Sequence, residues 1–146
     1  MLHPAINYSA DIPEHDNSRS CVLRVSTGSN SVLLTGDIDK KSESRLLQLH
    51  AKQLPAILLV VPHHGSMSSS TAAFVNAVHP RYAVFTSGYL NRFGHPKEEV
   101  VDRYRAVGSE ILRSDEDGAV GVEMNAQGLK LERYRKTHAR YWMAGS

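Results

Sequence analysis

The chain has 146 residues, of which 41% are hydrophobic and 22% are charged, so it is long enough to form one compact domain with its own core. Its formal net charge of +2 is too small to indicate nucleic-acid binding by itself. The single cysteine, Cys21, excludes an internal disulfide, and its place in the apolar run 21–25 predicts a buried thiol. The sequence shows neither a secretory signal nor an apolar run approaching the ~20 residues that span a bilayer, so we expect a soluble chain.

The first part of the chain predicts an irregular segment, two strands and a helix. Residues 1–20 are rich in turn-forming residues and predict a leader or irregular loop. Strands are expected over 21–26 and 31–35, joined by a turn at 27–30. Leucines then recur with helical spacing after Asp37 until Pro55, and Glu43 in the first turn suits the positive end of the helix dipole.

The second part of the chain continues with alternating strands and helices. Residues 57–61 form a short apolar run, which is typical of a strand buried on both faces. A serine-rich loop then leads into a short helix, a strand, a helix bounded by Pro96 and Gly108, and three final strands. We expect these elements over 71–78, 81–87, 96–108, 111–113, 119–124 and 129–134, with turns at 115–118 and 126–128. This order predicts an α/β fold with sheet and helices in layers.

Chemically active side chains follow three of these segments. The strand at 31–35 leads to Asp37, the strand at 57–61 leads to His63 and His64, and the turn at 91–96 carries His95. Imidazoles and carboxylates at the edge of a sheet are the ligands that divalent metals use in proteins. The pattern is therefore typical of the rim of a metallohydrolase.

Each of these residues also has a simpler interpretation. Asp37 is suited to cap the following helix, and His95 is suited to cap its own helix. One ring of the pair His63 and His64 could simply bond to the backbone of its turn. In an extended backbone, adjacent side chains point to opposite faces, so we expect one ring, His64 by preference, to face the site and the other to support it or contact substrate. Gly65 indicates a special backbone conformation after them.

Two further polar residues are candidates for substrate contact. Ser66 begins a serine run at 66–70, and because no Gly-x-Ser-x-Gly motif is present, we interpret these serines as loop or phosphate-contact residues. Asn91 holds the loop that carries His95 and is a candidate substrate-binding residue. Glycine motifs for dinucleotides or nucleoside triphosphates are absent, so no small-molecule cofactor is expected. The remaining histidines lack such neighbours and are expected in loops, tails or a helix surface: His3, His15, His50, His79 and His138.

Taken together, the segments 33–37, 61–66 and 91–96 resemble the metallo-β-lactamase-like domain at the C-terminus of ComEC competence proteins. Asn17 and Ser20, the segment 114–119 and the tail ending at 140–142 are similar to that domain as well. The resemblance runs from about residue 12 to the end. It implies an αββα metallo-β-lactamase-like sandwich, of which residues 1–146 form the C-terminal half. The partial domain then has a leader at 1–20, a core at 21–134 and a basic aromatic tail at 135–146.

The resemblance also implies a function. The parent proteins are polytopic inner-membrane proteins that form the channel for DNA uptake, and their C-terminal domain resembles a nuclease acting on the strand that is not imported. Carried over residue by residue, it implies one or two divalent ions, zinc or manganese, and single-stranded DNA as partner. It assigns candidate catalytic residues His63 and His64, candidate metal ligands Asp37, His64 and His95, and candidate substrate-binding residues Ser66 and Asn91.

One departure from the family pattern changes these expectations. The His-x-His-x-Asp-His-type motif that supplies the main ligands in the first half of metallo-β-lactamase folds is absent here. We therefore expect weak metal binding, and either a truncated piece or a chain completed by the missing N-terminal half and the membrane channel part. The leading hypothesis is the C-terminal part of a ComEC-like DNA-uptake protein, carrying part of a metal-dependent phosphodiesterase or nuclease site. Two alternatives are another hydrolase of this fold, acting on phosphocholine-type esters, and a non-catalytic binding module with a remnant half-site.

Overall fold

The centre of the molecule is a five-stranded sheet. The structure, a computed structural model, describes residues 1–4 and 16–138. The strand order is β1 (Leu23–Thr27), β2 (Asn30–Leu34), β3 (Leu58–Val60), β4 (Tyr82–Phe85) and β5 (Glu110–Arg113). The first two strands pair antiparallel, and the other neighbouring strands are parallel. The α/β class predicted from the sequence is therefore confirmed.

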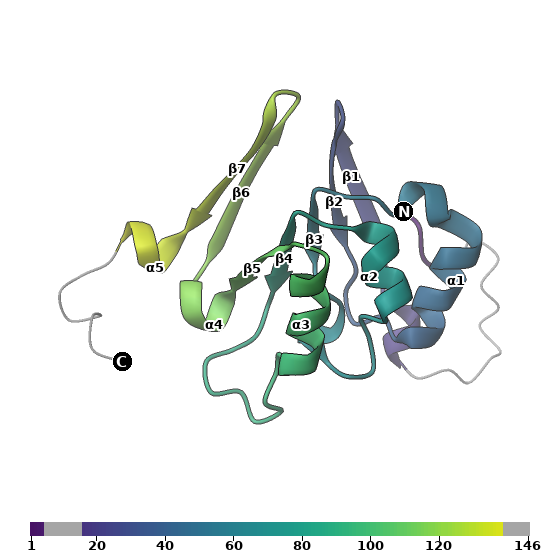
Figure 1. Cartoon of the computed structure of the whole chain (residues 1–146), viewed down its shortest axis with the longest axis horizontal. Helices are drawn as coiled ribbons and strands as arrows, with labels where there is room; N and C mark the ends of the chain where they lie inside the picture. The colour runs from purple at the N-terminus through teal and green to yellow at the C-terminus, as the bar shows by residue number, and fades with distance from the viewer. Residues whose placement is uncertain (5–15, 139–146) are drawn as a thin grey trace.

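Three helices connect the parallel strands and cover one face of the sheet (Figure 1). They are α1 (Lys40–His50), α2 (Ala72–Val78) and α3 (Glu98–Ala106). Their apolar faces bury a core against the strands, and its large side chains include Leu33, Leu46, Phe74, Phe85 and Tyr104. Burial of such side chains contributes roughly 1.5–3 kcal/mol each, so this layer helps to hold the strand ends in place.

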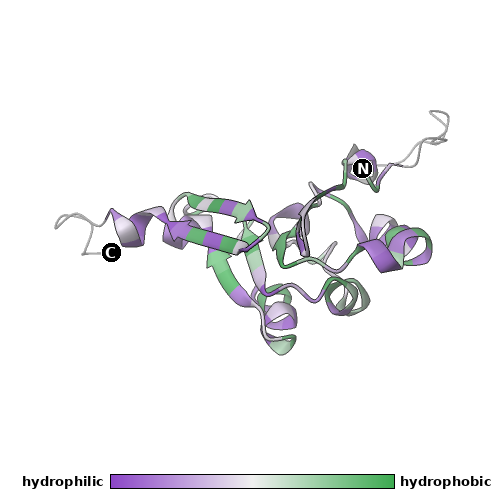
Figure 2. Cartoon of the chain, turned by 90° about the horizontal axis from the view of Figure 1, so that it is seen from above, coloured by the Kyte–Doolittle hydropathy of each residue, from purple (hydrophilic) through white to green (hydrophobic). Residues whose placement is uncertain are grey.

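A separate hairpin covers the opposite face of the sheet. It consists of β6 (Val120–Asn125) and β7 (Gly128–Arg133). Hydrophobic and hydrophilic residues alternate along it, as Figure 2 shows, because successive side chains of a strand point to opposite faces. Its apolar side packs on the second core, in which Leu58, Val84 and Leu112 are buried. The predicted strands at 119–124 and 129–134 thus form a layer of their own.

Two short helices stand where the sequence predicted other structure. α4 (Ser114–Asp117) replaces the expected turn, and the Asp117 carboxylate accepts a hydrogen bond from the Arg113 backbone N–H at 3.1 Å, which closes this single helical turn. α5 (Tyr134–Thr137) begins where the last strand was expected to end. After α1, residues Ala51–Gln53 form a 3-10 turn before Pro55. None of the helices in the described ranges is long and apolar enough to cross a membrane.

The prediction of a buried Cys21 thiol is wrong. Val22 is fully buried, and period-two alternation at the edge of the sheet therefore places its neighbour Cys21 on the exposed side. The start of the predicted leader also differs from a loop, because His3 is buried and pairs with Val22 through backbone hydrogen bonds. Residues 5–15 of the leader, including His15, and residues 139–146 of the tail lie outside the described residues.

Candidate functional site

The candidate residues lie beyond the carboxyl ends of β2, β3 and β4. This edge is where ligands bind in open α/β sheets. The loop after β2 carries Asp37, the turn after β3 carries His63 and His64, and the loop between β4 and α3 carries His95. A hydrogen bond joins the first two of these segments: the His63 backbone N–H donates to the Gly36 carbonyl at 3.0 Å. The fold thus brings three separate sequence signals to one edge.

His64 is oriented by the end of β4. Its Nδ1 lies 2.7 Å from the Thr86 carbonyl oxygen and 3.1 Å from the Thr86 hydroxyl. A carbonyl oxygen can only accept, so Nδ1 carries a proton, and in the neutral ring Nε2 presents its lone pair. Nε2 lies 3.6 Å from the Asp37 Oδ1 atom. Metal-binding histidines commonly share this feature, in which the second ring nitrogen donates to a backbone carbonyl.

Asp37 does not cap the following helix. The cap of α1 is Asp39, whose carboxylate accepts the Ser42 backbone N–H at 2.9 Å. Asp37 is held instead through its own backbone N–H, which donates to the Ser20 hydroxyl at 3.1 Å. Its carboxylate oxygen Oδ1 lies 3.6 Å from Nε2 of His64.

The predicted extended backbone at the histidine pair is wrong. His63 has φ 49° and ψ 42°, and His64 has φ 55° and ψ 19°, so both residues adopt the left-handed conformation. They form a tight turn over Pro62–Gly65, and the two rings lie 6.4 Å apart between centroids. The two rings therefore do not point to opposite faces of a strand, as an extended backbone would require.

The His63 ring has different partners from the His64 ring. Its Nδ1 lies 3.0 Å from the Ser68 hydroxyl and 3.5 Å from the Asn17 amide nitrogen. Since an amide nitrogen can only donate, the Asn17 contact favours the tautomer in which Nδ1 accepts and Nε2 carries the proton. His63 is thereby suited to donate a hydrogen bond, whereas His64 is suited to ligate.

His95 does not cap α3, because the residue at the helix cap is Lys97. The His95 ring lies 6.1 Å from that of His63 and stacks on Phe93 at 6.0 Å. Burial, followed by the charge of Lys97, lowers the pKa of His95, so its imidazole is neutral at pH 7. Its Nδ1 is buried and has no hydrogen-bond partner in the described part of the chain. Buried polar atoms without a partner are exceptional in folded proteins, so this nitrogen distinguishes His95 from the other described histidines.

A cavity of about 210 Å³ opens beside these rings. Its lining consists of His64, Thr86, Ser87, Gly88, Asn91, Phe93 and His95. The Asn91 amide donates to the carbonyls of Gly88 and His95 and accepts from the His95 backbone N–H, so it holds the loop, as the sequence indicated. The Ser66 hydroxyl lies 3.1 Å from that of Ser68. Substrate contact by Ser66 and Asn91 stays a prediction.

The buried carboxylate of Glu43 supports the loop that carries the histidines. The sequence predicted for it only a favourable interaction with the helix dipole. Glu43 is fully buried and accepts the backbone N–H groups of Ser70 and, at 2.9 Å, of Thr71. Arg103 donates to the Ser70 carbonyl at 2.8 Å, and the Tyr104 hydroxyl lies 2.9 Å from that of Ser70. Burial raises the pKa of Glu43 despite these hydrogen bonds. This network joins α1 and α3 to the loop that begins with the histidines.

The donors present fit part of a metal site. Two ligands on one tetrahedral zinc are about 3.3–3.6 Å apart when each bond is ~2.0–2.2 Å, which matches the 3.6 Å between His64 Nε2 and Asp37 Oδ1. Over residues 1–4 and 16–138, however, no group of three or more His, Cys, Asp or Glu side chains could hold a metal ion. The described residues therefore supply fewer ligands than a complete site needs.

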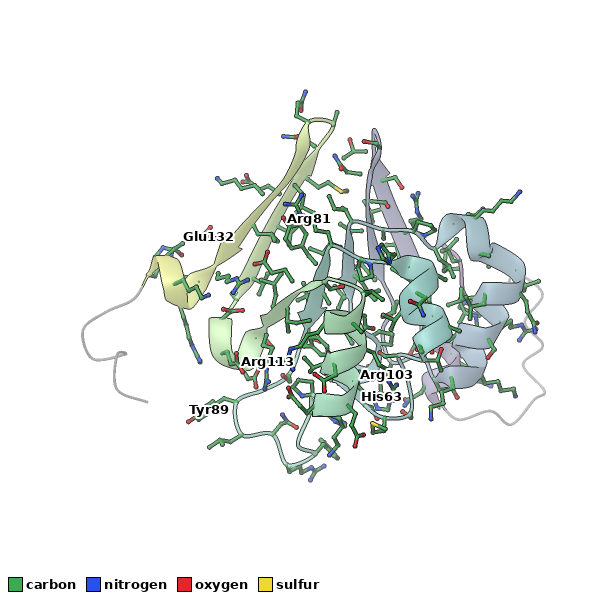
Figure 3. The ribbon with its side chains drawn as sticks, viewed as in Figure 1. His63, Arg81, Tyr89, Arg103, Arg113 and Glu132 are labelled. Atoms are coloured by element: carbon green, nitrogen blue, oxygen red, sulfur yellow. The ribbon has the colours of Figure 1, made fainter. Side chains whose placement is uncertain are left out.

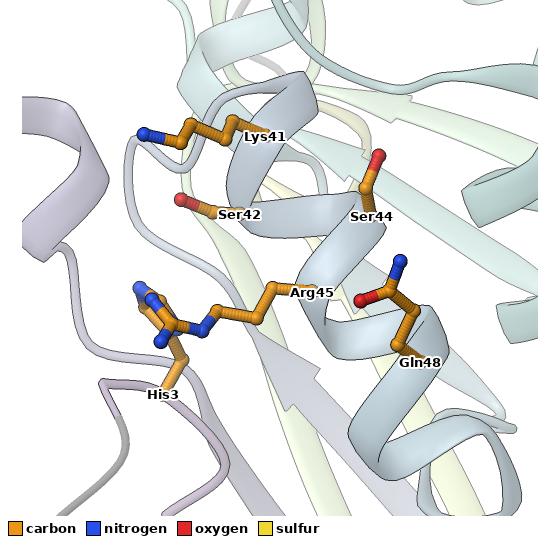
Figure 4. Close-up of a pocket in the computed structure, with 6 residues that line it drawn as sticks. All are labelled: His3, Lys41, Ser42, Ser44, Arg45 and Gln48. Atoms are coloured by element: carbon orange, nitrogen blue, oxygen red, sulfur yellow. The ribbon is translucent and has the colours of Figure 1, made fainter. Parts of the chain in front are cut away.

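A second, basic cavity lies along α1, away from the candidate residues. Its volume is about 300 Å³, and it is lined by His3, Lys41, Ser42, Ser44, Arg45 and Gln48. Figure 4 shows the Arg45 side chain reaching from α1 toward the His3 ring. None of the candidate catalytic or metal-binding residues lines this cavity.

Comparison with known proteins identifies relatives for this α/β chain with its histidine–aspartate edge. It is 45% identical over 127 residues to competence protein ComA of Neisseria gonorrhoeae, covering 87% of this chain and 18% of that protein. It is 36% identical over 121 residues to recombination protein 2 of Haemophilus influenzae, covering 82% and 15%. It is 32% identical over 108 residues to ComE operon protein 3 of Bacillus subtilis, covering 74% and 14%.

These identities show that the chain is homologous to one region of these competence and recombination proteins. The chain spans less than a fifth of the length of the curated relatives that it matches. No protein-family model matches the chain.

Proposed function

We propose that this chain carries part of a metal-dependent phosphodiesterase site that acts on DNA, within a ComEC-like protein of DNA uptake at the inner membrane. The fold we propose is the C-terminal half of an αββα metallo-β-lactamase-like sandwich. Helices on one face of the mixed sheet and a β layer on the other support this assignment, as does homology to a region of gonococcal competence protein ComA.

The observation that carries the proposal is the pair formed by His64 and Asp37. The Thr86 carbonyl holds the proton of His64 on Nδ1, so that Nε2 presents a lone pair toward a carboxylate oxygen 3.6 Å away. Two electron-rich atoms facing each other repel unless a cation or a proton lies between them. A divalent ion, zinc or manganese, is the occupant that this donor pair suits.

The other residues have roles that follow from their contacts. A divalent ion bound here supplies charge stabilisation to a phosphodiester and an activated water. His63 donates a hydrogen bond from its Nε2–H to a phosphate oxygen or to the leaving-group oxygen. His95 lines the cavity beside this pair, and its role as a further ligand stays a prediction. Ser66 contacts the phosphate, and Asn91 holds the loop over the site and lines the cavity beside it.

A chimera tests this function in the cell. This chain replaces the matching 127-residue region of gonococcal ComA, and the frequency of natural transformation is measured. We expect the chimera to transform, and Asp37→Asn and His64→Ala to lower the frequency by at least about tenfold, since removing a ligand or its charge commonly has an effect of this size. His50→Gln, at the end of α1, is the matched control and should have no effect. Normal transformation by Asp37→Asn and His64→Ala, at equal protein levels, would contradict the proposal.

The binding-module alternative has one observation in its favour, namely that the described residues contain no three-ligand cluster. Titration calorimetry of the purified chain with Mn²⁺ separates the two functions. If the chain carries part of a nuclease site, Mn²⁺ should bind weakly to the wild type and not at all to Asp37→Asn. A remnant module expects no heat of binding in either protein.

A further inference from the structure

The loop between β4 and α3 exposes large apolar side chains next to the candidate site. Tyr89 is 67% exposed, Leu90 is 84% exposed and Phe93 is 60% exposed. Figure 3 shows Tyr89 on the outer side of this loop, away from the sheet. Single exposed apolar residues are ordinary on a protein surface, but three such residues within five positions form a patch of the kind that marks an interaction site.

The charge of this loop favours an anionic partner. Residues 88–97 contain Arg92 and Lys97 and no acidic residue. The guanidinium of Arg92 lies 4.8 Å from the centre of the Phe93 ring, so cation and aromatic ring form one surface. A partner with both flat apolar groups and negative charge matches this combination.

Internal hydrogen bonds hold the loop in one shape. The Asn91 amide bonds to both ends of the loop, the Gly94 N–H donates to the Asn91 carbonyl at 3.0 Å, and Lys97 Nζ donates to the Phe93 carbonyl at 2.9 Å. The aromatic rings are therefore presented with little ordering cost on binding.

The same loop lines the cavity beside the candidate site. Phe93 and Asn91 share this cavity with His64 and His95, and the Phe93 ring stacks on the His95 ring. A chain held on the aromatic residues therefore continues directly into the site.

We propose that Tyr89 and Phe93 form a stacking surface for unpaired bases, with the Arg92 guanidinium moving from the face of Phe93 to the phosphate backbone as a base takes its place, so that the loop binds single-stranded nucleic acid. This inference rests on the proposed function, because it places a DNA chain at the site. Bases in a duplex are already stacked on each other, so only a single strand offers free faces to these rings. A lipid surface would match the apolar groups and the charge, but it gives no reason for a rigid loop that continues into a cavity lined by histidines.

Binding of a fluorescent oligothymidylate to the purified chain tests the proposal. The titration contains chelator, so that binding is measured without hydrolysis. We expect Tyr89→Ala and Phe93→Ala each to weaken binding by about 5- to 150-fold, the range for loss of one base–aromatic stack, and Tyr89→Trp to retain it. Tyr134→Ala is the matched control, since Tyr134 is an exposed tyrosine on α5. An oligomer of abasic sites should bind weakly and should not distinguish Tyr89→Ala from the wild type.

The proposal is overturned if the wild type does not bind the oligomer, if both alanine variants bind it within about twofold of the wild type, or if binding of an abasic oligomer is equally sensitive to the substitutions. Flotation with phosphatidylglycerol vesicles tests the lipid alternative, and loss of vesicle binding in Tyr89→Ala without loss of oligomer binding also overturns it. Titration of Mn²⁺ into the wild type and Asp37→Asn, which involves no oligomer, tests the site separately, so the failure of one idea leaves the other measurable.

Discussion

At the scale of single residues, the geometry of the site depends on the turn of two left-handed histidines followed by glycine. Gly65 has φ +82°, and a Cβ atom there would lie 2.7 Å from Pro96 Cβ and 2.8 Å from Phe85 Cδ1. The Gly65 carbonyl also accepts the Lys97 N–H at 3.1 Å. Close packing against β4 and the loop before α3 therefore requires glycine at this position.

Gly65→Ala should destabilise the protein by about 2–4 kcal/mol, because it combines backbone strain with overpacking. Gly108→Ala is the control, since Gly108 has φ +80° but nothing within 4 Å of the added Cβ. Urea denaturation measures both. If the two variants lose equal stability, packing against Pro96 and Phe85 contributes nothing and this account of the turn is wrong.

Glu43 gives the stability a pH dependence of defined sign. Burial raises its pKa above 4.5 in the folded state, so the folded protein holds this proton more tightly than the unfolded chain does. The stability associated with the proton is fully present below pH 4.5 and is lost as the pH rises through the raised folded pKa. Glu43→Gln cannot titrate, so the stability advantage of the wild type over this variant should narrow from pH 4 upward. Thermal unfolding of both proteins between pH 4 and pH 8 measures this difference in stability. A difference that grows with pH would show that the pKa of Glu43 is not raised in the folded state.

At the scale of elements, the β6–β7 hairpin holds the second face of the sheet through its apolar side. Leu129 and Leu131 pack on Leu58, Val84 and Leu112, and Arg133 pairs with Glu110 and Asp117 beside them. The hairpin therefore packs on one face of the sheet while the helices pack on the other.

Leu131→Ala should cost about 1–2 kcal/mol of unfolding free energy, because its side chain is half-buried against the sheet. Lys130→Ala, on the opposite side of the same strand, should change stability by less than about 0.5 kcal/mol. Chemical denaturation of both variants compares them. Equal losses would mean that the hairpin does not pack on the sheet.

Local pattern predicted most elements to within two residues, because alternation, helical spacing and end signals are properties of neighbouring residues. The strand expected at 31–35 is observed at Asn30–Leu34, and the helix expected at 96–108 is observed at Glu98–Ala106. What local pattern could not supply depends on distant partners. The left-handed turn at His63 and His64 is held by Gly36 and Thr86, and Glu43 acquires its role from Ser70 and Thr71. The gathering of Asp37, His63, His64 and His95 at one edge of the sheet was therefore predictable, whereas the tautomers of the histidines and the contacts that hold them were not.

At the scale of the whole molecule, the fold brings histidine and aspartate side chains to one edge of the sheet, but the described residues there are too few to form a complete metal site. The carboxyl ends of three strands gather Asp37, His63, His64 and His95, and the N-terminal residues Asn17 and Ser20 reach the same edge. The matching regions of the relatives amount to 14–18% of each protein. The proposed site needs ligands in addition to those of residues 1–4 and 16–138.

The central claim is that a divalent ion lies between His64 and Asp37. Anomalous diffraction at the zinc edge, from crystals grown with Zn²⁺, tests it most directly. We predict an anomalous peak at ~2.0–2.2 Å from both His64 Nε2 and an Asp37 carboxylate oxygen, and no such peak in Asp37→Asn crystals. Zinc peaks at other histidines, with none between these two residues at saturating Zn²⁺, would contradict the claim.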